Sequence, residues 1–234
     1  MIELPEFDLY LFDLDDTLIN TRQAYTSAQA TTIRIAFPDL TGNELAAGLK
    51  DLSWLCRIFG SGNPEGYFSA FLASRSDLRR NGKTTVSALT ASYRSTFENN
   101  LAPLAGTEAY LLALANRKKR MALVSNGVSR SQFKKLQLSG LDAFFPESHC
   151  YISESYHPTQ KKPSPYMIRR ACQETGIDSA QSVFFGNSPE DILAGNLAGV
   201  ATVLVGDNME LKNDTPDIAL PDYQMAGWLD ALKG

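Results

Sequence analysis

The sequence is poor in the residues that build disulfide frameworks and zinc sites. Its 234 residues include three cysteines and two histidines. The cysteines, Cys56, Cys150 and Cys172, form an odd and scattered set with no pairing motif, which indicates a reducing compartment and buried thiols. His149 and His157 lack the ligand spacing of a zinc site. We therefore expect neither a disulfide-stapled nor a zinc-held fold.

The chain also lacks long apolar runs, an excess of basic residues, internal repeats and low-complexity tracts. Its formal net charge is -4, which argues against nucleic acid or an anionic membrane as the main partner. No stretch has the pattern of a signal peptide or the length of a membrane span. With 44% hydrophobic residues the chain can build one large core, or one core and a smaller domain. We expect a cytoplasmic protein that is a monomer or a homodimer.

The most informative stretch places a cluster of carboxylates directly after an apolar run. Leu9–Phe12 is rich in strand-forming residues and has no helical spacing, which predicts a strand buried on both faces. Asp13, Asp15 and Asp16 follow it. Carboxylates at the end of a buried strand are costly unless a cation compensates them. Mg2+ fits this position, because it takes oxygen ligands and keeps water and substrate phosphate in its shell.

The acidic cluster could also have a purely structural role or bind calcium. Asp residues after a strand can cap a helix or form a turn. A calcium-binding EF-hand loop would need Gly at its sixth position and Glu at its twelfth. Counted from Asp13, those positions hold Leu18 and Ala24, so the calcium loop is excluded and the capping role stays open.

The remaining chain falls into two parts with different patterns. Residues from about 20 to 100 show helical spacing and no convincing strand; we expect helices over 20–37, 44–59, from 63–64 onward and from 84 or 85 to 97. The aromatic residues of this part are expected to form its core, although one or two of them could line the cleft instead: Trp54, Phe59, Tyr67, Phe68 and Phe71. After residue 100, strands and helices alternate, which predicts a parallel sheet with helices on both faces.

In this second part the expected strands are 121–124, 150–152, 183–185 and 201–205, with an edge strand at 218–220. The expected helices are 107–114, 129–138, 163–175, one starting at 188–191, and a closing helix over 223–232. The opening strand belongs to the same sheet, so the helical part is an insertion.

Ligands of such sheets bind at the carboxyl ends of the strands, where the strand order reverses. The strand ends here carry polar groups from distant parts of the sequence: Asp13, Asp15, Ser125, Asn126, Gly186 and Asn187. We expect these residues to meet at one edge of the sheet.

Together these groups supply what phosphoryl transfer requires. Asp13 can act as the nucleophile and form an aspartyl-phosphate, while Asp15 protonates the leaving alcohol and then activates water. Ser125 and the amides around Asn126 can hold a phosphate oxygen, and Lys162 can neutralise the accumulated negative charge.

Asn187 and Asp191 can complete a metal shell at the same edge. Residues 188–191, Ser-Pro-Glu-Asp, are equally a good helix start, because they offer a cap, a first-turn proline and acids at the positive end of the helix dipole.

The motifs resemble those of the haloacid dehalogenase-like hydrolases, and they occur in that family's order. Residues 13–17, Asp-Leu-Asp-Asp-Thr, resemble the DxDxT motif, and 124–127, Val-Ser-Asn-Gly, resemble the second motif. Residues 162–166, Lys-Pro-Ser-Pro-Tyr, resemble the third, and 185–191, Phe-Gly-Asn-Ser-Pro-Glu-Asp, resemble the GDSxxD motif. Residues 103–106, Pro-Leu-Ala-Gly, resemble the segment by which the family's chain returns from its cap.

The resemblance implies a Rossmann-like, doubly wound α/β core over residues 1–18 and 101–234, and an α-helical cap domain over 19–100. It implies a Mg2+-dependent phosphatase that acts on a small phosphorylated metabolite. It also implies metal ligands at Asp13, Asp15 through its carbonyl, Asn187 and Asp191. Phosphate would be bound by Thr17, Ser125, Asn126 and Lys162. A phosphomutase of the same family is the alternative. Members that displace halide lack an Asp at position 15, so a dehalogenase is disfavoured.

One position departs from the family pattern. The family usually has Asp where this chain has Asn187. An amide oxygen can still bind Mg2+, but the site loses one negative charge. We expect weaker metal binding with the chemistry retained; a catalytically impaired binding protein is the alternative.

Overall fold

The computed structural model describes residues 4–60, 62–75, 84–206 and 216–232. The chain divides into two compact units, one formed by Met1–Asn20 with Ala102–Gly234 and the other by Thr21–Leu101. The assignment of residues 19–100 as a cap domain stays a prediction. No helix in the described ranges has the length and apolar character needed to cross a bilayer.

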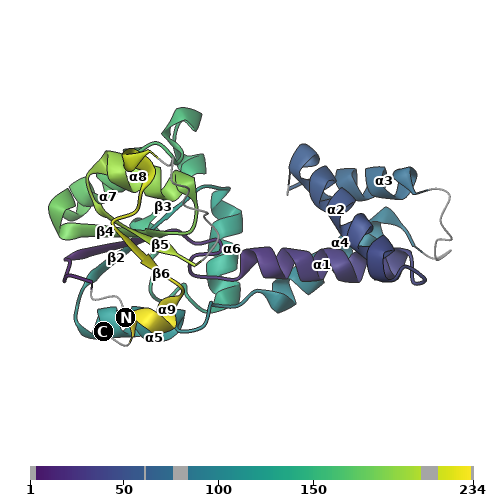
Figure 1. The fold of residues 1–234 in the computed structure, drawn as a ribbon, viewed down its shortest axis with the longest axis horizontal. Helices are drawn as coiled ribbons and strands as arrows, with labels where there is room; N and C mark the ends of the chain where they lie inside the picture. The colour runs from purple at the N-terminus through teal and green to yellow at the C-terminus, as the bar shows by residue number, and fades with distance from the viewer. Residues whose placement is uncertain (1–3, 61, 76–83, 207–215, 233–234) are drawn as a thin grey trace. The chain divides into compact units, whose positions relative to one another are not determined.

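The first unit is built on a six-stranded sheet whose order is β3-β2-β1-β4-β5-β6 (Figure 1). All neighbouring strands run parallel. The strands are β1 Leu9–Phe12, β2 Arg120–Ser125, β3 Cys150–Ile152, β4 Ser182–Gly186, β5 Ala201–Val205 and β6 Tyr223–Met225. From β1 the chain proceeds to β2 and β3 on one side, and then crosses to β4, β5 and β6 on the other. The predicted doubly wound parallel sheet is therefore confirmed, with its switch point at β1.

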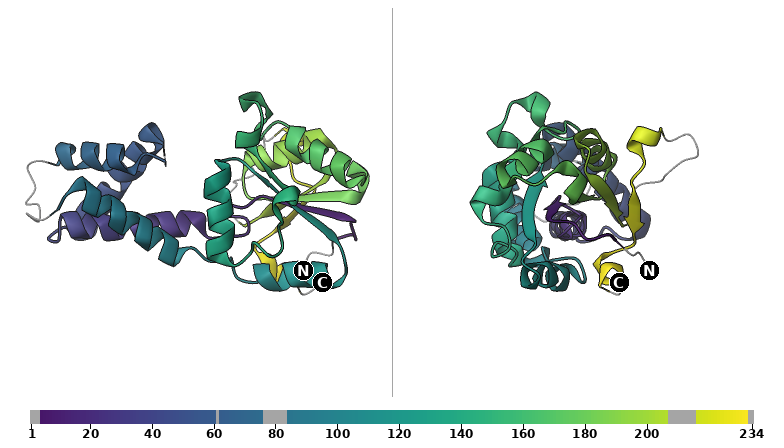
Figure 2. Two further views of the ribbon diagram at one scale, coloured as in Figure 1. Left: turned by 180° about the vertical axis from the view of Figure 1, so that it is seen from behind. Right: turned by 90° about the vertical axis from the view of Figure 1, so that its left-hand side faces the viewer.

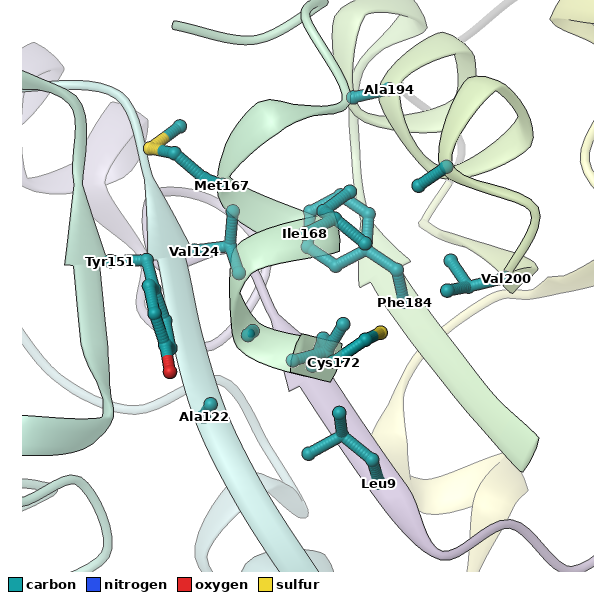
Figure 3. Packing of buried hydrophobic residues seen from close by; sticks show 13 residues of the cluster. Leu9, Ala122, Val124, Tyr151, Met167, Ile168, Cys172, Phe184, Ala194 and Val200 are labelled. Carbon is teal, nitrogen blue, oxygen red and sulfur yellow. The ribbon is translucent and has the colours of Figure 1, made fainter. Parts of the chain in front are cut away.

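Helices cover both faces of this sheet, as Figures 1 and 2 show. They are α5 Thr107–Asn116, α6 Ser129–Ser139, α7 Tyr166–Thr175, α8 Pro189–Ala198 and the short α9 Trp228–Ala231. On one face, Met167 and Ile168 of α7 pack among Val124 and Phe184 of the strands, in one continuous buried cluster (Figure 3).

The opposite face of the sheet is aromatic. Trp228 of α9 lies 5.2 Å from Phe185 and 5.7 Å from Phe12, measured between ring centroids. Tyr110 of α5 lies 5.0 Å from Trp228. These rings are almost fully buried, so this face fixes the end of β1 at which the carboxylates follow.

The second unit is entirely helical in its described residues. Its helices are α1 Thr21–Ala36, α2 Gly42–Phe59, α3 Pro64–Ser74 and α4 Val86–Asn100. Tyr67, Phe68 and Phe71 form its buried core, as expected. Trp54 and Phe59 do not, because they are 53% and 42% exposed. The expectation that these two rings belong to the core is wrong.

The end of the chain differs from the prediction. Residues 218–220 do not form an edge strand, because Asp217–Ala219 is a 3-10 turn and the Asn196 side chain donates to the carbonyls of Ile218 and Leu220, both at 2.8 Å. The edge strand is β6, within the segment where a long closing helix was expected. Ala226 and Gly227 separate β6 from α9, which has four residues.

The helix expected over 163–175 is α7, and it begins at Tyr166 rather than at residue 163. Residues 163–165 therefore stay in the loop that carries Lys162, and this loop lies at the carboxyl edge of the sheet.

Candidate active site

The strand register places the carboxyl ends of β1, β2 and β4 next to one another at one edge of the sheet. Phe12, the last residue of β1, pairs with Leu123 of β2 on one side and with Phe185 of β4 on the other. The next residue, Asp13, donates its backbone N–H to the Phe185 carbonyl at 2.9 Å. The polar residues that close β2 and β4 therefore flank the carboxylates that follow β1.

A tight turn follows β1. The Leu14 carbonyl accepts from the amides of Leu18 and Ile19 at 3.0 and 3.2 Å, and Asp16 has the left-handed φ of 58° that this turn requires. The indole N–H of Trp228 donates to the Thr17 carbonyl at 2.7 Å. The aromatic face of the sheet thus holds the turn in place, and Asp13 and Asp15 with it.

A buried lysine joins two carboxylates at the centre of the site. Lys162 Nζ lies 2.5 Å from Asp13 Oδ1 and 2.6 Å from Asp191 Oδ1, and it donates to the Val124 carbonyl at 2.9 Å. All three charged side chains are less than a tenth exposed. A lone buried charge would cost several kcal/mol, so this arrangement is tolerable only because the charges compensate one another.

The compensation is incomplete. Burial, with smaller contributions from the nearby carboxylates of Asp191 and Asp15, raises the pKa of Asp13 to about 7 against the opposing charge of Lys162. Burial acts to lower the pKa of Lys162, but Asp13 and Asp191 raise it above its ordinary value. The lysine therefore stays protonated, while Asp13 still lacks enough positive charge to be fully ionised at neutral pH.

Asp191 is fixed by the start of α8. Its Oδ2 accepts from the Asn187 and Ser188 amides at 3.2 and 3.1 Å and from the Ser188 hydroxyl at 2.6 Å, in a reciprocal capping box. A Cβ at Gly186 would lie 2.2 Å from the Cβ of Asp191, so only glycine leaves room here. Capping and the contact with Lys162 use different oxygens, so Asp191 serves the helix and the site at once.

The loop that carries Lys162 is held by Asn126. The amide side chain of Asn126 accepts from the Lys162 backbone N–H at 2.9 Å and donates to its carbonyl at 3.0 Å. This paired contact uses both polar atoms of the Asn126 side chain to fix the backbone of the lysine from the end of β2, while the next backbone amide, that of Gly127, donates to Ser153 Oγ at 2.9 Å.

Two acceptor oxygens share one hydrogen beside Asp13. The Thr17 hydroxyl lies 3.2 Å from both Asp13 Oδ2 and Asn187 Oδ1, and it can donate to only one of them at a time. One oxygen is therefore left without that hydrogen. Such a surplus of oxygen acceptors suits a hard cation.

The donor set as a whole fits Mg2+ in chemistry, with reduced charge. No cluster of three or more His, Cys, Asp or Glu side chains able to hold a metal occurs in the part of the chain that the structure describes. The oxygens at this edge are instead two carboxylates, Asp13 and Asp191, the amide of Asn187, and the backbone of Asp15. Mg2+ accepts this mixture when substrate phosphate and water complete its shell.

These groups open onto a hollow of about 450 Å³, a size suited to a small ligand. Five carboxylates and two lysines are among its lining residues, which are Asp13, Asp15, Asp16, Asn126, Lys161, Lys162, Pro163, Asn187, Ser188, Glu190 and Asp191. A phosphate would be repelled from so acidic a hollow unless a cation entered with it. Thr17 and Ser125 are nearly fully buried and are not among these lining residues.

A larger hollow of about 760 Å³ runs along α7. Its charged groups are already engaged: Arg170 pairs with Glu174 at 2.6 Å, and Arg169 donates to the Leu197 carbonyl. Its described lining residues include no carboxylate pair and no buried lysine, so the smaller hollow is the candidate active site.

Two side chains at the site were missed by the sequence reasoning. Gln132 and Lys135 of α6 are 1% and 8% exposed and both contact the carboxylate of Asp15. Their three-residue spacing places them on one face of α6, together with the buried Leu136. That spacing was the usable signal, but Gln and Lys in an amphipathic helix are ordinarily assigned to the solvent face.

Fold and side chains together define a doubly wound α/β domain with a buried, partly neutralised carboxylate at its switch point. Residues 7–199 match the family described as haloacid dehalogenase-like hydrolase. This chain belongs to that family and is an enzyme of the hydrolase class.

Relatives align with the chain over nearly its whole length. It is 26% identical to pyrophosphatase PpaX of Halalkalibacterium halodurans, over 97% of this chain and 96% of the relative. It is 28% identical to glyceraldehyde 3-phosphate phosphatase of Methanopyrus kandleri, over 92% and 91%. The crystal structure of the HAD-hydrolase YfnB from Bacillus subtilis, bound to magnesium, has a TM-score of 0.66 and 24% identity, with 98% of each chain covered.

Proposed function

We propose that this protein is a Mg2+-dependent phosphomonoesterase that acts on a small phosphorylated metabolite through an aspartyl-phosphate on Asp13. The observation that carries the proposal is the buried contact of 2.5 Å between Asp13 and Lys162 at the switch point, with Asp191 on the other side of the lysine. A carboxylate held in this way is oriented by one oxygen, so the other can attack.

In the first step, Oδ2 of Asp13, the oxygen that Lys162 does not contact, forms a bond to phosphorus while the bond from phosphorus to the leaving oxygen breaks. Asp15 gives that leaving oxygen a proton. In the second step, Asp15 takes a proton from water, whose oxygen attacks phosphorus and breaks its bond to Asp13. Asp15 lines the same hollow as Asp13, as both steps require.

Charge and hydrogen bonding support the transferred phosphoryl group. Lys162 neutralises one of its negative charges, and the Ser125 hydroxyl with the amides around Asn126 binds its oxygens. Thr17 is proposed to bind phosphate as well, although its hydroxyl is turned toward Asp13 and Asn187.

Asp13, the carbonyl of Asp15, Asn187 and Asp191 are the proposed holders of Mg2+. The ion would supply the positive charge that the acidic hollow lacks, and it would keep Asp13 ionised at neutral pH. The magnesium-bound YfnB structure and the acceptor surplus beside Thr17 support this assignment. We further propose that residues 19–100 serve as the cap domain.

The substrate class is inferred from the hollow and from the relatives. A volume of about 450 Å³ suits a small molecule. Two relatives are named for a pyrophosphatase and for a phosphatase of glyceraldehyde 3-phosphate, both of which cleave small phosphorylated compounds.

The test is release of inorganic phosphate from 4-nitrophenyl phosphate and from a panel of phosphorylated metabolites, with and without Mg2+. We expect phosphate release that needs Mg2+ and is abolished by Asp13→Asn. Asp8→Asn is the matched control, because Asp8 precedes the opposite end of the same strand and is 55% exposed. Its activity should equal that of the parent.

Three results would overturn the proposal. A phosphomutase would give an isomer of the substrate instead of free phosphate. A dehalogenase would release halide without Mg2+. A binding protein would retain ligand and release no phosphate at any Mg2+ concentration.

A further inference from the structure

Asp15 is held by two side chains that no motif of the family resemblance includes. Lys135 Nζ lies 2.6 Å from Asp15 Oδ1 and 2.9 Å from Oδ2, so it contacts both carboxylate oxygens. Gln132 Nε2 donates to Asp15 Oδ2 at 2.9 Å. Contacts to both oxygens restrict the position and the rotation of the carboxylate, and a proton can be delivered only along a defined direction.

Gln132 also links Asp15 to the proposed phosphate-binding loop. Its Nε2 lies 2.7 Å from Ser125 Oγ and 3.1 Å from the Asn126 carbonyl. When Ser125 Oγ accepts a hydrogen bond from Gln132, its own hydrogen is left to point elsewhere, such as toward a phosphate oxygen. One amide therefore orients a proton donor for the leaving group and a hydroxyl for the phosphate.

The backbone leaves room for this amide. A Cβ at Gly127 would lie 2.9 Å from Gln132 Nε2 and 3.1 Å from its Cδ, and Gly127 has a φ of 152° that side chains rarely adopt. Within the described residues, Gln132 Oε1 is buried without a hydrogen-bond partner. Burying an unpaired acceptor costs about 1–3 kcal/mol, so packing alone does not explain a glutamine here.

We propose that Gln132 and Lys135 are positioning residues of the reaction: they hold the Asp15 carboxylate where it can protonate the leaving oxygen, and Gln132 orients Ser125 toward the phosphate. This inference rests on the proposed phosphatase function. It assigns no proton transfer to Lys135 itself.

The dependence of rate on the leaving group separates positioning from a merely structural role. The second-order constant kcat/KM reports the steps up to loss of the leaving group. An alkyl alkoxide needs a proton to leave, whereas 4-nitrophenolate needs little help. A displaced Asp15 therefore slows alkyl esters selectively, while general loss of structure slows both classes alike.

The experiment compares Lys135→Met, Lys135→Arg and Gln132→Leu with the parent, using 4-nitrophenyl phosphate and the alkyl phosphate that the parent cleaves fastest. For Lys135→Met we expect kcat/KM to fall roughly 100-fold with the alkyl ester and by less than about threefold with the aryl ester, since general acids contribute about 10²–10⁴-fold. Lys135→Arg should restore most of the alkyl rate, because guanidinium also contacts both carboxylate oxygens. Gln132→Leu should lower the alkyl rate and also raise KM for both esters.

Lys134→Met is the matched control, because Lys134 is exposed on the same helix and the same substitution is made there. Equal losses of Lys135→Met on both esters, or no loss on either, would overturn the proposal. The proposal would also fail if Lys135→Arg lowered kcat/KM for the alkyl ester as much as Lys135→Met does. If Lys135→Met does not fold, Lys135→Arg and Gln132→Leu decide the question alone. A parent protein that releases no phosphate would refute the proposed function instead, so the two failures are distinguishable.

Discussion

The substitution Asn187→Asp tests the proposed metal site, because its effect on Mg2+ affinity can be estimated from the structure. Substitution of Asn187 by Asp would place a second carboxylate oxygen beside Asp13, because both present oxygens lie 3.2 Å from Thr17 Oγ1. Two unit charges about 4 Å apart attract by roughly 4 kcal/mol at an effective dielectric constant of about 20, and a divalent cation doubles that attraction. Desolvation of the introduced carboxylate and the competing positive charge of Lys162 offset part of this added attraction for Mg2+.

We expect a net gain of at least about 1.4 kcal/mol, which lowers the Mg2+ concentration for half-maximal rate at least about tenfold. The measurement is a Mg2+ titration of phosphate release at fixed substrate. A parallel Mg2+ titration followed by thermal unfolding reports the same affinity without depending on turnover.

The metal-free variant should change in the opposite direction. Without the cation, the carboxylate introduced at position 187 and that of Asp13 repel each other, by roughly 3 kcal/mol if they lie about 6 Å apart at the same dielectric constant. Without Mg2+ at pH 8, where Asp13 is ionised, the variant should therefore melt below the parent, by roughly 6–12 °C if all of that repulsion appears in the fold. Added Mg2+ should reverse this order.

Asn116→Asp provides the matched control. Asn116 is exposed at the end of α5, just before the start of β2, and so lies at the sheet edge opposite the site. The Asn116→Asp variant adds the same charge without reaching the proposed metal. Its Mg2+ requirement should equal that of the parent. If Asn187→Asp also leaves the Mg2+ requirement unchanged, Asn187 is not at the metal and the reasoning fails.

Three further predictions concern the same edge of the sheet. Gly186→Ala should remove nearly all activity, because its Cβ would lie 2.2 Å from that of Asp191; phosphate release tests this, and a fully active variant would contradict it. Since burial raises the pKa of Asp13 to about 7 against Lys162, and an ionised carboxylate attacks, the rate should fall below that pH at low Mg2+. Bound cation lowers that pKa, so pH profiles at rising Mg2+ should move their acid limb to lower pH; a fixed limb would be contrary to this assignment. Trp228→Phe should cost about 1–3 kcal/mol of unfolding free energy in urea titrations, because it leaves a buried carbonyl without its donor at 2.7 Å; unchanged stability would show that this bond contributes little.

The sequence predicted which residues follow the ends of β1 and β4, because the signals for these elements were local. The apolar run Leu9–Phe12 has no helical spacing and is followed by Asp13, which favours a buried strand with a carboxylate at its end, and the carboxyl ends of parallel strands share one edge. The capping pattern before Asp191 likewise predicted where α8 begins. What the sequence could not supply were the distances, since those depend on strand order and register.

Three misjudged segments share a physical cause, which is dependence on a distant partner. Residues 218–220 are apolar enough for a strand, but the side chain of Asn196 satisfies two of their carbonyls. Trp54 is exposed and lies on the side of α2 away from the buried Leu52, and its aromatic character alone does not reveal whether it finds a partner. Gln132 is a polar residue of a type that ordinarily faces solvent, although it is buried against Asp15.

Asn187 is better understood as a compromise than as the loss of a site. With Asp at this position, Lys162 would have to balance three buried carboxylates without a cation, and burial together with Asp191 and Asp15 already raises the pKa of Asp13 to about 7. Asn187 removes one unit of that repulsion and keeps an oxygen in the same place. We expect the metal-free protein to be easier to fold, and the proposed Mg2+ binding to be weaker through the same electrostatic interaction. The glycine beside Asp191, the capping box and the lysine contacts are all present. We therefore expect catalysis to persist at a higher Mg2+ requirement, with Mg2+ raising the melting temperature of the parent less than that of Asn187→Asp.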